Sequence, residues 1–368
     1  MTFKDHVAQW IDCRRCRLCE GRDRVVLARG QVPCDALFVG EAPAESENVL
    51  GQPFCIAENQ RVLTASLEWK PIGDLVVGDK LLAPDEHGSI TGTGVSGIGL
   101  RKWRVATIKA IRRTAGVMCQ AVETKLGELI ATSDHQVLTA YPTNCKARRW
   151  LRISQLVKTL SRASCLAQAV APWTLGADYR SGWIGGFLDG EGHVIKKGEH
   201  KVGCGFAQNS GPTLDRALQY LNELGFKCNQ DSGSSLPNKK IRILGGLRSI
   251  FRLLGKTRPE RLITNLLKRI EERGPKLYGV NPARVTMIAK HGFHDVVDIK
   301  TTTGTFVCEG FVVHNCGPAG HLLDDIIKRS QAQAFRVAFT NLVACIPRDD
   351  DGGKATEPDD ESIEACRP

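Results

Sequence analysis

The chain has 368 residues, of which 42% are hydrophobic and 24% charged, and it carries a formal net charge of +10 with a pI near 9.0. This length allows two or three domains, and the composition excludes a disordered chain. The positive charge favours an anionic partner, nucleic acid first, although a soluble protein can be basic without one.

The sequence predicts neither export nor membrane insertion. The first residues lead into a charged segment rather than a signal peptide, and no apolar run of about 18 residues is present. The 14 cysteines are therefore expected in a reducing cytoplasm, where thiols serve metal binding or nucleophilic chemistry rather than structural disulfides.

The chain changes character several times along its length. Residues 1–54 run from a Cys-rich helical segment to a short apolar strand at 36–39 and a loop at 40–43. Residues 55–155 contain short β-type runs broken by Gly and Asp, which predicts a mostly β module.

Residues 180–275 predict an inserted region with helices. The apolar run Trp183–Leu188 ends in Asp-Gly-Glu-Gly, and helical periodicity follows at 214–221, 247–254 and 262–270.

The β pattern returns at 285–315. Residues 316–368 then predict a helix at 321–330, a strand at 337–339 and an acidic loop at 349–361. The order is nested, because two halves of one domain enclose two halves of a β module, which encloses the helical region.

Nucleophiles bracket the β module. Cys55 opens it, and His314-Asn315 closes it directly before Cys316. The first thiol can attack the preceding carbonyl and form a thioester, because Cys is strongly nucleophilic and its thiolate leaves readily. Cys316 can take over the acyl group, and the side-chain amide of Asn315 can attack its own backbone carbonyl. The two freed ends would then join at high effective concentration.

Other residues supply the expected helpers. In Thr132-Ser-Asp-His135, the histidine would protonate the departing amide nitrogen and the threonine would hold the peptide by a hydrogen bond. His314 would polarise the last scissile carbonyl, and Asp298 would order protons between the two cysteines. Taken singly, a buried thiol or a core histidine would explain these residues equally well. The joint pattern favours excision.

These blocks resemble the splicing domain of an intein over about residues 55–155 and 285–315. The resemblance implies a mostly β (Hint) fold that excises residues 55–315 autocatalytically and without a cofactor. Many inteins carry a His where this chain has Gly304, so we expect C-terminal cleavage to depend on His314 and Asp298. The matching blocks are Cys55-Ile56-Ala57 with Val62-Leu63-Thr64, Gly73-Asp74-Leu75 with Gly78-Asp79, Thr132–His135, and Val312–Cys316.

Trp183–Gly192 resembles the LAGLIDADG motif of homing endonucleases, which implies an α+β DNA endonuclease domain over 180–275. Gly185 and Gly186 would let two motif helices approach closely, and acids at the helix base would hold Mg²⁺ over the scissile phosphates. By motif position, Glu191 is the metal-binding acid, and Asp189 either caps the turn or supports Glu191.

The sequence contains one clear copy of this motif, because the partial echo at 244–248 has no acid after it. A single-motif enzyme would pair as a homodimer and read a near-palindromic site. Basic segments at 196–197 and 239–242 would contact DNA phosphates. A decayed nuclease that keeps the fold without activity is the alternative.

Joining the flanks brings two pairs of cysteines into one sequence: Cys13-x-x-Cys16, and Cys345 with Cys366. Two separated pairs suit a [4Fe–4S] cluster. The chemistry alone leaves a zinc site or a redox Cys-x-x-Cys equally open.

The joined flanks, 1–54 and 316–368, resemble the family 4 uracil-DNA glycosylases and their phage relatives. The resemblance implies an αβα sandwich whose four cysteines hold the cluster. In its pocket for flipped uracil, Phe54 would stack on the base, Asn341 would hydrogen-bond its edge, and Glu41 would orient the attacking water. The matching segments are Cys13–Arg22, Gly40–Pro43, Gly51–Phe54 joined to Cys316–Asp324, and Thr340–Cys345.

The chain ends before that family's later His-containing motif, so we expect a truncated host. Two alternatives of other classes stay open: a DNA endonuclease whose splicing is dead, and a non-catalytic iron–sulfur DNA-binding remnant. Because the insertion directly follows Phe54, the unspliced host is expected to have a disrupted base pocket.

Overall fold

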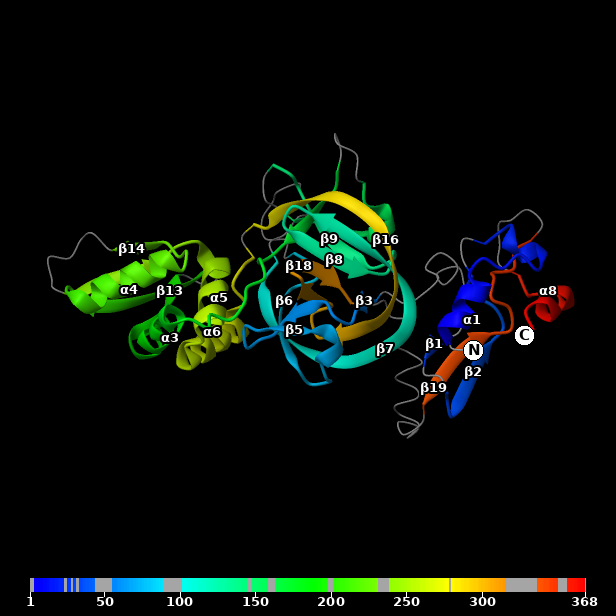
Figure 1. Cartoon of the computed structure of the whole chain (residues 1–368), viewed down its shortest axis with the longest axis horizontal. Helices are drawn as coiled ribbons and strands as arrows, with labels where there is room; N and C mark the ends of the chain where they lie inside the picture. The colour runs from blue at the N-terminus through cyan, green and yellow to red at the C-terminus, as the bar shows by residue number, and fades with distance from the viewer. Residues whose placement is uncertain are drawn as a thin grey trace.

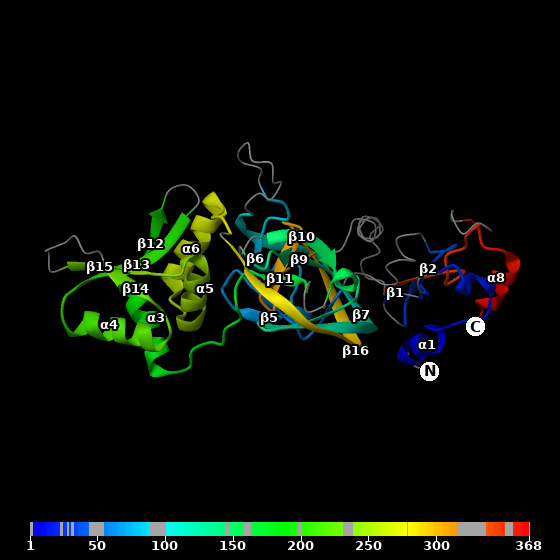
Figure 2. The same cartoon turned by 90° about the horizontal axis from the view of Figure 1, so that it is seen from above.

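The described residues of the computed structural model are 3–22, 25–27, 29–30, 33–43, 55–88, 101–143, 147–157, 163–197, 201–230, 238–277, 279–315, 336–349 and 356–367. Figure 1 shows three groups of elements along the long axis: a helical region, a central β module and the two flanks. Figure 2 gives the same order from above. Both chain ends lie in the same group, and the helical region lies at the opposite end.

The central β module makes the described chain mostly β. Within the described residues it is a 12-stranded sheet built from both sides of the helical region. Its strands are β3 (Ile56–Ala57), β4 (Arg61–Leu63), β5 (Trp69–Pro71), β6 (Lys80–Pro84), β7 (Trp103–Thr124), β8 (Gly127–Ala131), β9 (Gln136–Ala140), β10 (Ala147–Arg152), β11 (Cys165–Gln168), β16 (Asn281–Thr301), β17 (Thr305–Cys308) and β18 (Phe311–His314).

Two long strands, β7 and β16, shape this module. They pair antiparallel along most of their length and wrap around the shorter strands (Figure 1). Their register shifts at several bulges, one of them beside Gly292, whose φ of 90° suits a residue without Cβ. β11 belongs to the same sheet, so this sheet continues beyond residue 155.

The helical region is an α+β layer. A four-stranded antiparallel sheet has the order β12-β13-β15-β14, and helices α3, α4 and α5 contact its middle strand β13. Phe206 and Ile241 are buried between the sheet and the helices. The elements are α3 (Tyr179–Glu191), β12 (Gly192–Lys197), β13 (Lys201–Asn209), α4 (Pro212–Glu223), β14 (Cys228–Gln230), β15 (Asn238–Ile243), α5 (Gly246–Thr257) and α6 (Glu260–Arg273).

One hydrophobic core joins the helical region to the β module. The edge of Trp103 on β7 meets Phe251 on α5, with ring centroids 5.1 Å apart. Trp69 on β5 meets Trp173 in the connection, at 5.4 Å. These side chains belong to a single buried cluster or pack against it, so the helical region is packed on the β module rather than tethered to it.

The flanks meet in a three-stranded sheet of order β1-β19-β2, where β19 runs parallel to β2. Asp35 and Arg336, from opposite flanks, form an ion pair at 2.8 Å. The two flanks are therefore associated with each other, although residues 55–315 lie between them in the sequence. The elements are α1 (Phe3–Trp10), a 3₁₀ turn (Arg17–Cys19), β1 (Arg29–Gly30), β2 (Ala36–Gly40), β19 (Val337–Asn341) and α8 (Asp360–Ala365).

The C-terminal flank differs from expectation at one point. Helix α8 begins at Asp360, inside the stretch expected to be a loop, because Asp359 caps it by accepting from the Ser362 N–H at 2.8 Å. The expected helix at 321–330 lies outside the described residues. Among the described residues, every helix is too short or too polar to cross a membrane.

Candidate active site

Cys55 lies at the start of the β module and only 1% of its surface is exposed. Its backbone N–H donates to Thr132 Oγ1 at 3.1 Å, and its carbonyl oxygen accepts from the Thr132 N–H at 3.0 Å. Thr132 follows β8, which pairs with β3. One residue therefore holds both polar groups of the Cys55 backbone, including the nitrogen that loses its acyl group in an N-to-S shift.

Asp298 lies on the other side of Cys55. β16 pairs with β3 through Val297 and Ile56, so the next position in the register sets Asp298 opposite Cys55. Its side chain is buried, with 5% exposed. Thr132 and Asp298 thus flank the thiol from two neighbouring strands. Cys316, the other cysteine expected near Asp298, lies outside the described residues.

His135 occupies the turn after β8. Its backbone N–H donates to the Thr132 carbonyl at 3.0 Å, and its buried ring meets the edge of Phe306 on β17 at 6.5 Å. The turn therefore places His135 on the same support as Thr132, as the Thr-x-x-His spacing suggests.

A second buried thiol lies near Cys55. Cys119, on β7, belongs to the same small hydrophobic cluster. Burial, and to a lesser degree the nearby Cys55, raise the pKa of Cys119 to about 12. It stays protonated at neutral pH and does not compete as a nucleophile.

Asn315 is held at the far end of β16. Its backbone N–H donates to the Gly304 carbonyl at 2.9 Å, and its side-chain Nδ2 donates to the Thr301 carbonyl at 3.3 Å. The Thr301 hydroxyl also lies 3.4 Å from Asn315 Oδ1. The side-chain amide that would attack the backbone is thus fixed by the last residue of a rigid strand.

His314 contacts the carbonyl that this attack would open. Its Nδ1 lies 2.6 Å from the Asn315 carbonyl oxygen, and its Nε2 lies 2.8 Å from Glu86 Oε1. The Trp150 ring meets the imidazole edge at 5.1 Å. The ring is therefore fixed between an acceptor carboxylate and the scissile carbonyl.

β16 connects the two reaction sites. Asp298, beside Cys55, and Thr301, which holds Asn315, are three positions apart on this strand. At about 3.3 Å per residue, this separation is about 10 Å. One strand thus connects the surroundings of Cys55 and Asn315, which lie far apart in the sequence.

The predicted nuclease acids lie at the end of α3. Glu191 is exposed at the last helical position. Asp189 Oδ1 accepts from the Arg261 N–H at 2.7 Å, and the Arg261 side chain donates to the carbonyls of Gly190 and Gly192 at 3.1 and 2.9 Å. Asp189 therefore caps the start of α6, and Arg261 caps the end of α3.

The two helix glycines have different surroundings. Gly185 is buried, and an added Cβ would collide with the Thr257 carbonyl at the end of α5. Gly186 is exposed, as are Gly182 and Gly190 at the same four-residue spacing, and an added Cβ would meet nothing at any of the three. The close approach in this chain is therefore between α3 and α5, whereas the Gly182–Gly190 side of α3 is open.

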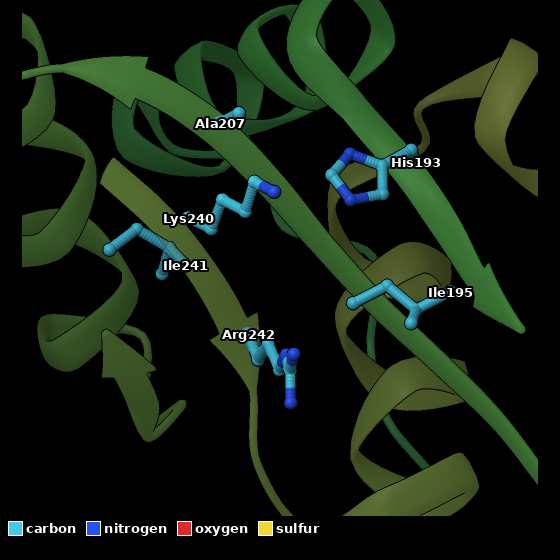
Figure 3. A pocket seen from close by; sticks show the side chains of 6 residues that line it. All are labelled: His193, Ile195, Ala207, Lys240, Ile241 and Arg242. Carbon is cyan, nitrogen blue, oxygen red and sulfur yellow. The ribbon is translucent and has the colours of Figure 1, made fainter. Parts of the chain in front are cut away.

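A basic hollow of about 240 Å³ lies on the four-stranded sheet. Figure 3 shows Lys240 and Arg242 on β15 facing it from one side and His193 on β12 from the other, across β13. Lys240 and His193 are exposed, whereas Ile241 between the basic residues is buried. Because successive side chains of a strand point to opposite faces of the sheet, one face of this sheet packs against the helices and the other is basic and faces outward.

The flanks bring the predicted pocket residues to one sheet edge. Asn341 pairs with Gly40 at the carboxyl ends of the parallel strands β19 and β2, and Glu41 follows Gly40 directly. The Val343 N–H donates to the Glu41 carbonyl at 3.3 Å. Phe54, the predicted stacking residue, lies outside the described residues.

The four predicted cluster ligands also converge. Burial raises the pKa of Cys345. Arg22, whose Nη1 donates to Cys345 Sγ at 3.0 Å, opposes this, and Cys366 and Cys16 have smaller raising effects. Burial raises the pKa of Cys366 too, with added effects of Cys16 and Cys13. Four cysteines are the donor type that an iron–sulfur cluster needs, but among the described residues no three Cys, His, Asp or Glu side chains are grouped tightly enough to hold a metal ion.

Three residues that contact His314 or Asn315 are not indicated by any pattern in the sequence. Glu86, Trp150 and Thr301 contact His314 or Asn315 from separate segments. Each is an ordinary loop or strand residue in isolation, so only the fold identifies it.

No family model matches the chain. Similar solved structures are inteins. A DnaB intein from Synechocystis sp. PCC 6803 is 12% identical, covers 71% of this chain and 98% of its own, and has a TM-score of 0.33. The DnaX mini intein from Spirulina platensis is 10% identical, covers 71% of this chain and 99% of its own, and has a TM-score of 0.29. The gp41-1 intein is 12% identical, covers 72% of this chain and 100% of its own, and has a TM-score of 0.26. Because these TM-scores are low, the function proposed below rests on the site geometry.

Proposed function

We propose that this chain is a self-splicing precursor that excises residues 55–315 and joins its flanks. The observation that carries the proposal is that the first and last residues of the segment, Cys55 and Asn315, both lie beside strand β16 and both have their backbone held by a neighbouring side chain. Thr132 holds the Cys55 backbone, and His314 Nδ1 lies 2.6 Å from the Asn315 carbonyl oxygen.

The proposed reaction begins at Cys55. Its sulfur attacks the carbonyl carbon of residue 54, the C–N bond breaks, and the freed Cys55 nitrogen takes a proton, for which His135 is the donor expected from its place beside Thr132. Cys316 then takes over the acyl group by thioester exchange. Asp298, opposite Cys55 in the register, would accept and return the thiol protons.

The last step releases the segment. Asn315 Nδ2 attacks its own carbonyl carbon, the bond to Cys316 breaks, and a succinimide forms. The proton lost from Nδ2 ends on the leaving amine. The thioester then rearranges to an amide within the joined flanks.

Intact-mass analysis of the expressed chain tests splicing. The expected products are an excised 55–315 segment and a joined chain of 1–54 and 316–368. Asn315→Ala should keep the segment attached to the C-terminal flank, and Cys55→Ala should keep it attached to the N-terminal flank. If wild-type chain persists at full mass and neither substitution changes its fate, the proposal is wrong.

We propose DNA endonuclease activity as a second function of the helical region. The basic outer face at His193, Lys240 and Arg242 supports it, because phosphates are contacted by such residues. The open side of α3 gives a second copy room to pack, with Glu191 exposed beside it. One carboxylate cannot hold a cation alone, so Glu191 would share Mg²⁺ with DNA phosphates and the second copy.

Cleavage of a plasmid that carries the uninterrupted host sequence tests this function. We expect Mg²⁺-dependent cutting that Glu191→Gln abolishes. Lys240→Ala should weaken DNA binding and lower the slope of log affinity against log salt by about 1. Glu128→Gln, at an exposed position on β8 of the β module, is the control. Equal cutting by Glu191→Gln would contradict the role of this acid.

For the flanks we propose a uracil-binding, iron–sulfur protein of the glycosylase type, in which Glu41 and Asn341 face the base at the ends of β2 and β19. Cys13, Cys16, Cys345 and Cys366 would hold the cluster. Iron and sulfide analysis of anaerobically purified protein tests the metal, and zinc in their place would contradict the cluster. Uracil release from DNA by the spliced product tests activity.

A further inference from the structure

We propose that Glu86 is a positioning residue for C-terminal cleavage, where it holds the His314 ring as an imidazolium aimed at the Asn315 carbonyl. This inference rests on the proposed splicing function. Glu86 lies in the loop after β6, far in sequence from either splice end.

The contacts define the orientation of the ring. His314 Nε2 lies 2.8 Å from Glu86 Oε1, and Nδ1 on the other side lies 2.6 Å from the Asn315 carbonyl oxygen. Both partners are acceptors, because an ionised carboxylate and a carbonyl have no hydrogen to donate. Both ring nitrogens must therefore carry hydrogens, which is the imidazolium form.

Glu86 is itself fixed. Its backbone carbonyl accepts from Arg101 Nε at 3.2 Å and from Trp150 Nε1 at 3.4 Å. Trp150 also packs on the His314 ring. The carboxylate and the ring it holds thus share one support, which limits the geometries that the pair can adopt.

Gly304 leaves the space that the carboxylate fills. An added Cβ at Gly304 would lie 2.5 Å from Glu86 Oε2, and the residue has a φ of 75°, which favours glycine. The same glycine accepts the Asn315 N–H. Other charged groups near the carboxylate are His87, whose Nε2 lies 3.4 Å from Oε1 and is largely exposed, and the buried Arg101.

In the cleavage step, the His314 Nδ1–H stabilises the negative charge that develops on the carbonyl oxygen as Nδ2 attacks. The bond to residue 316 then breaks, and the Nδ2 proton ends on the leaving amine. Glu86 touches none of the reacting atoms. It acts by accepting the Nε2 hydrogen and holding the ring so that Nδ1 is aimed at the Asn315 carbonyl.

Glu86→Gln tests this role, because it keeps the shape of the side chain and removes its charge. We expect the C-terminal cleavage rate to fall by about tenfold to hundredfold, as for loss of a charged hydrogen bond. N-terminal cleavage induced by an added thiol should keep its wild-type rate, which also reports that the variant is folded. His87→Gln is the matched control and should splice normally.

Two outcomes would overturn the inference: an unchanged C-terminal rate in Glu86→Gln, or an equal loss of both cleavage steps. A double variant gives a further check. Because Glu86 acts through His314, adding Glu86→Gln to His314→Gln should slow cleavage no further than His314→Gln alone. Additive losses would mean that the two residues act separately.

The ring can also be observed directly. In chain blocked by Cys55→Ala and Asn315→Ala, ¹⁵N spectra at neutral pH should show His314 with two protonated nitrogens, and with one when Glu86→Gln is added. A neutral ring in the chain that retains Glu86 would overturn the inference. This measurement needs no splicing, so a chain that fails to splice would contradict the proposed function without deciding the role of Glu86.

Discussion

Thr132 holds the backbone of Cys55 on both sides. Its hydroxyl accepts from the Cys55 N–H at 3.1 Å and its own N–H donates to the Cys55 carbonyl at 3.0 Å. The hydrogen bonds fix the orientation of a buried peptide whose nitrogen becomes the leaving group. In the proposed reaction, the hydroxyl would accelerate this step by stabilising the departing amine more than the starting amide.

Thr132→Val should therefore slow thiol-induced N-terminal cleavage. The loss of one buried hydrogen bond predicts a reduction of about tenfold, equivalent to about 1.4 kcal/mol. Thr132→Ser keeps the hydroxyl and should stay near the wild-type rate. Quantifying the released N-terminal flank over time after addition of thiol measures both. A wild-type rate in Thr132→Val would mean that the hydroxyl has no role.

At the residue scale, the sequence predicts the groups that belong to local patterns. Thr132 and His135 share a turn, and His314 and Asn315 are neighbours in the chain, so their spacing already implies their proximity. The sequence does not predict Glu86, because its contact with His314 depends on loop geometry more than 200 residues away in the chain.

At the scale of elements, the two sides of α3 have different surroundings. Gly185 faces Thr257 of α5 without room for a methyl group, whereas Gly186 faces open space. The helix was predicted from an apolar run and a motif, and both were sufficient to place it. Which glycine contacts a neighbour was not predictable, because both were expected to face a second motif helix.

Gly185→Ala and Gly186→Ala should therefore have opposite effects. Gly185→Ala forces α3 away from α5 and should destabilise the chain by about 1–3 kcal/mol. Gly186→Ala should stabilise it by up to about 1 kcal/mol, through helix propensity alone. Urea unfolding of the splicing-blocked chain measures both free energies. Equal effects would contradict the different surroundings of the two glycines.

The long strands β7 and β16 show the limit of local patterns. Short runs at 296–299 and 311–313 were predicted as strands, but β16 begins at Asn281 and continues across bulges to Thr301. Bulges interrupt the two-residue alternation of apolar side chains, so periodicity detects only the regular pieces. The length matters, because it allows one strand to hold both Asp298 and Thr301.

At the scale of the whole molecule, the flanks assemble with each other at one end of the molecule, beside the β module (Figure 1). β2 and β19 pair in parallel although residues 55–315 lie between them, and both chain ends lie in this group. The two flanks are thus paired while residues 55–315 still separate them in sequence, and the joined product of the proposed reaction would keep this pairing.

The ion pair between Asp35 and Arg336 makes this association sensitive to acid. Hydrogen bonds from Arg336 lower the pKa of Asp35 from 3.8 to about 2. A carboxyl whose pKa is lowered by folding stabilises the folded state above its unfolded pKa, and this contribution is lost as the pH falls toward the folded value. The pairing of β2 with β19 should therefore weaken between about pH 4 and about pH 2.

Hydrogen exchange in β2 and β19 of the splicing-blocked chain measures this. Asp35→Asn removes the charge at every pH, so its exchange should exceed that of the unsubstituted chain at pH 6 and converge with it near pH 2. Asp178→Asn is the comparison, because Asp178 also has a lowered pKa but caps α3 in the helical region instead of joining the flanks. If Asp35→Asn exchanges like the unsubstituted chain at pH 6, the ion pair does not hold the flanks together.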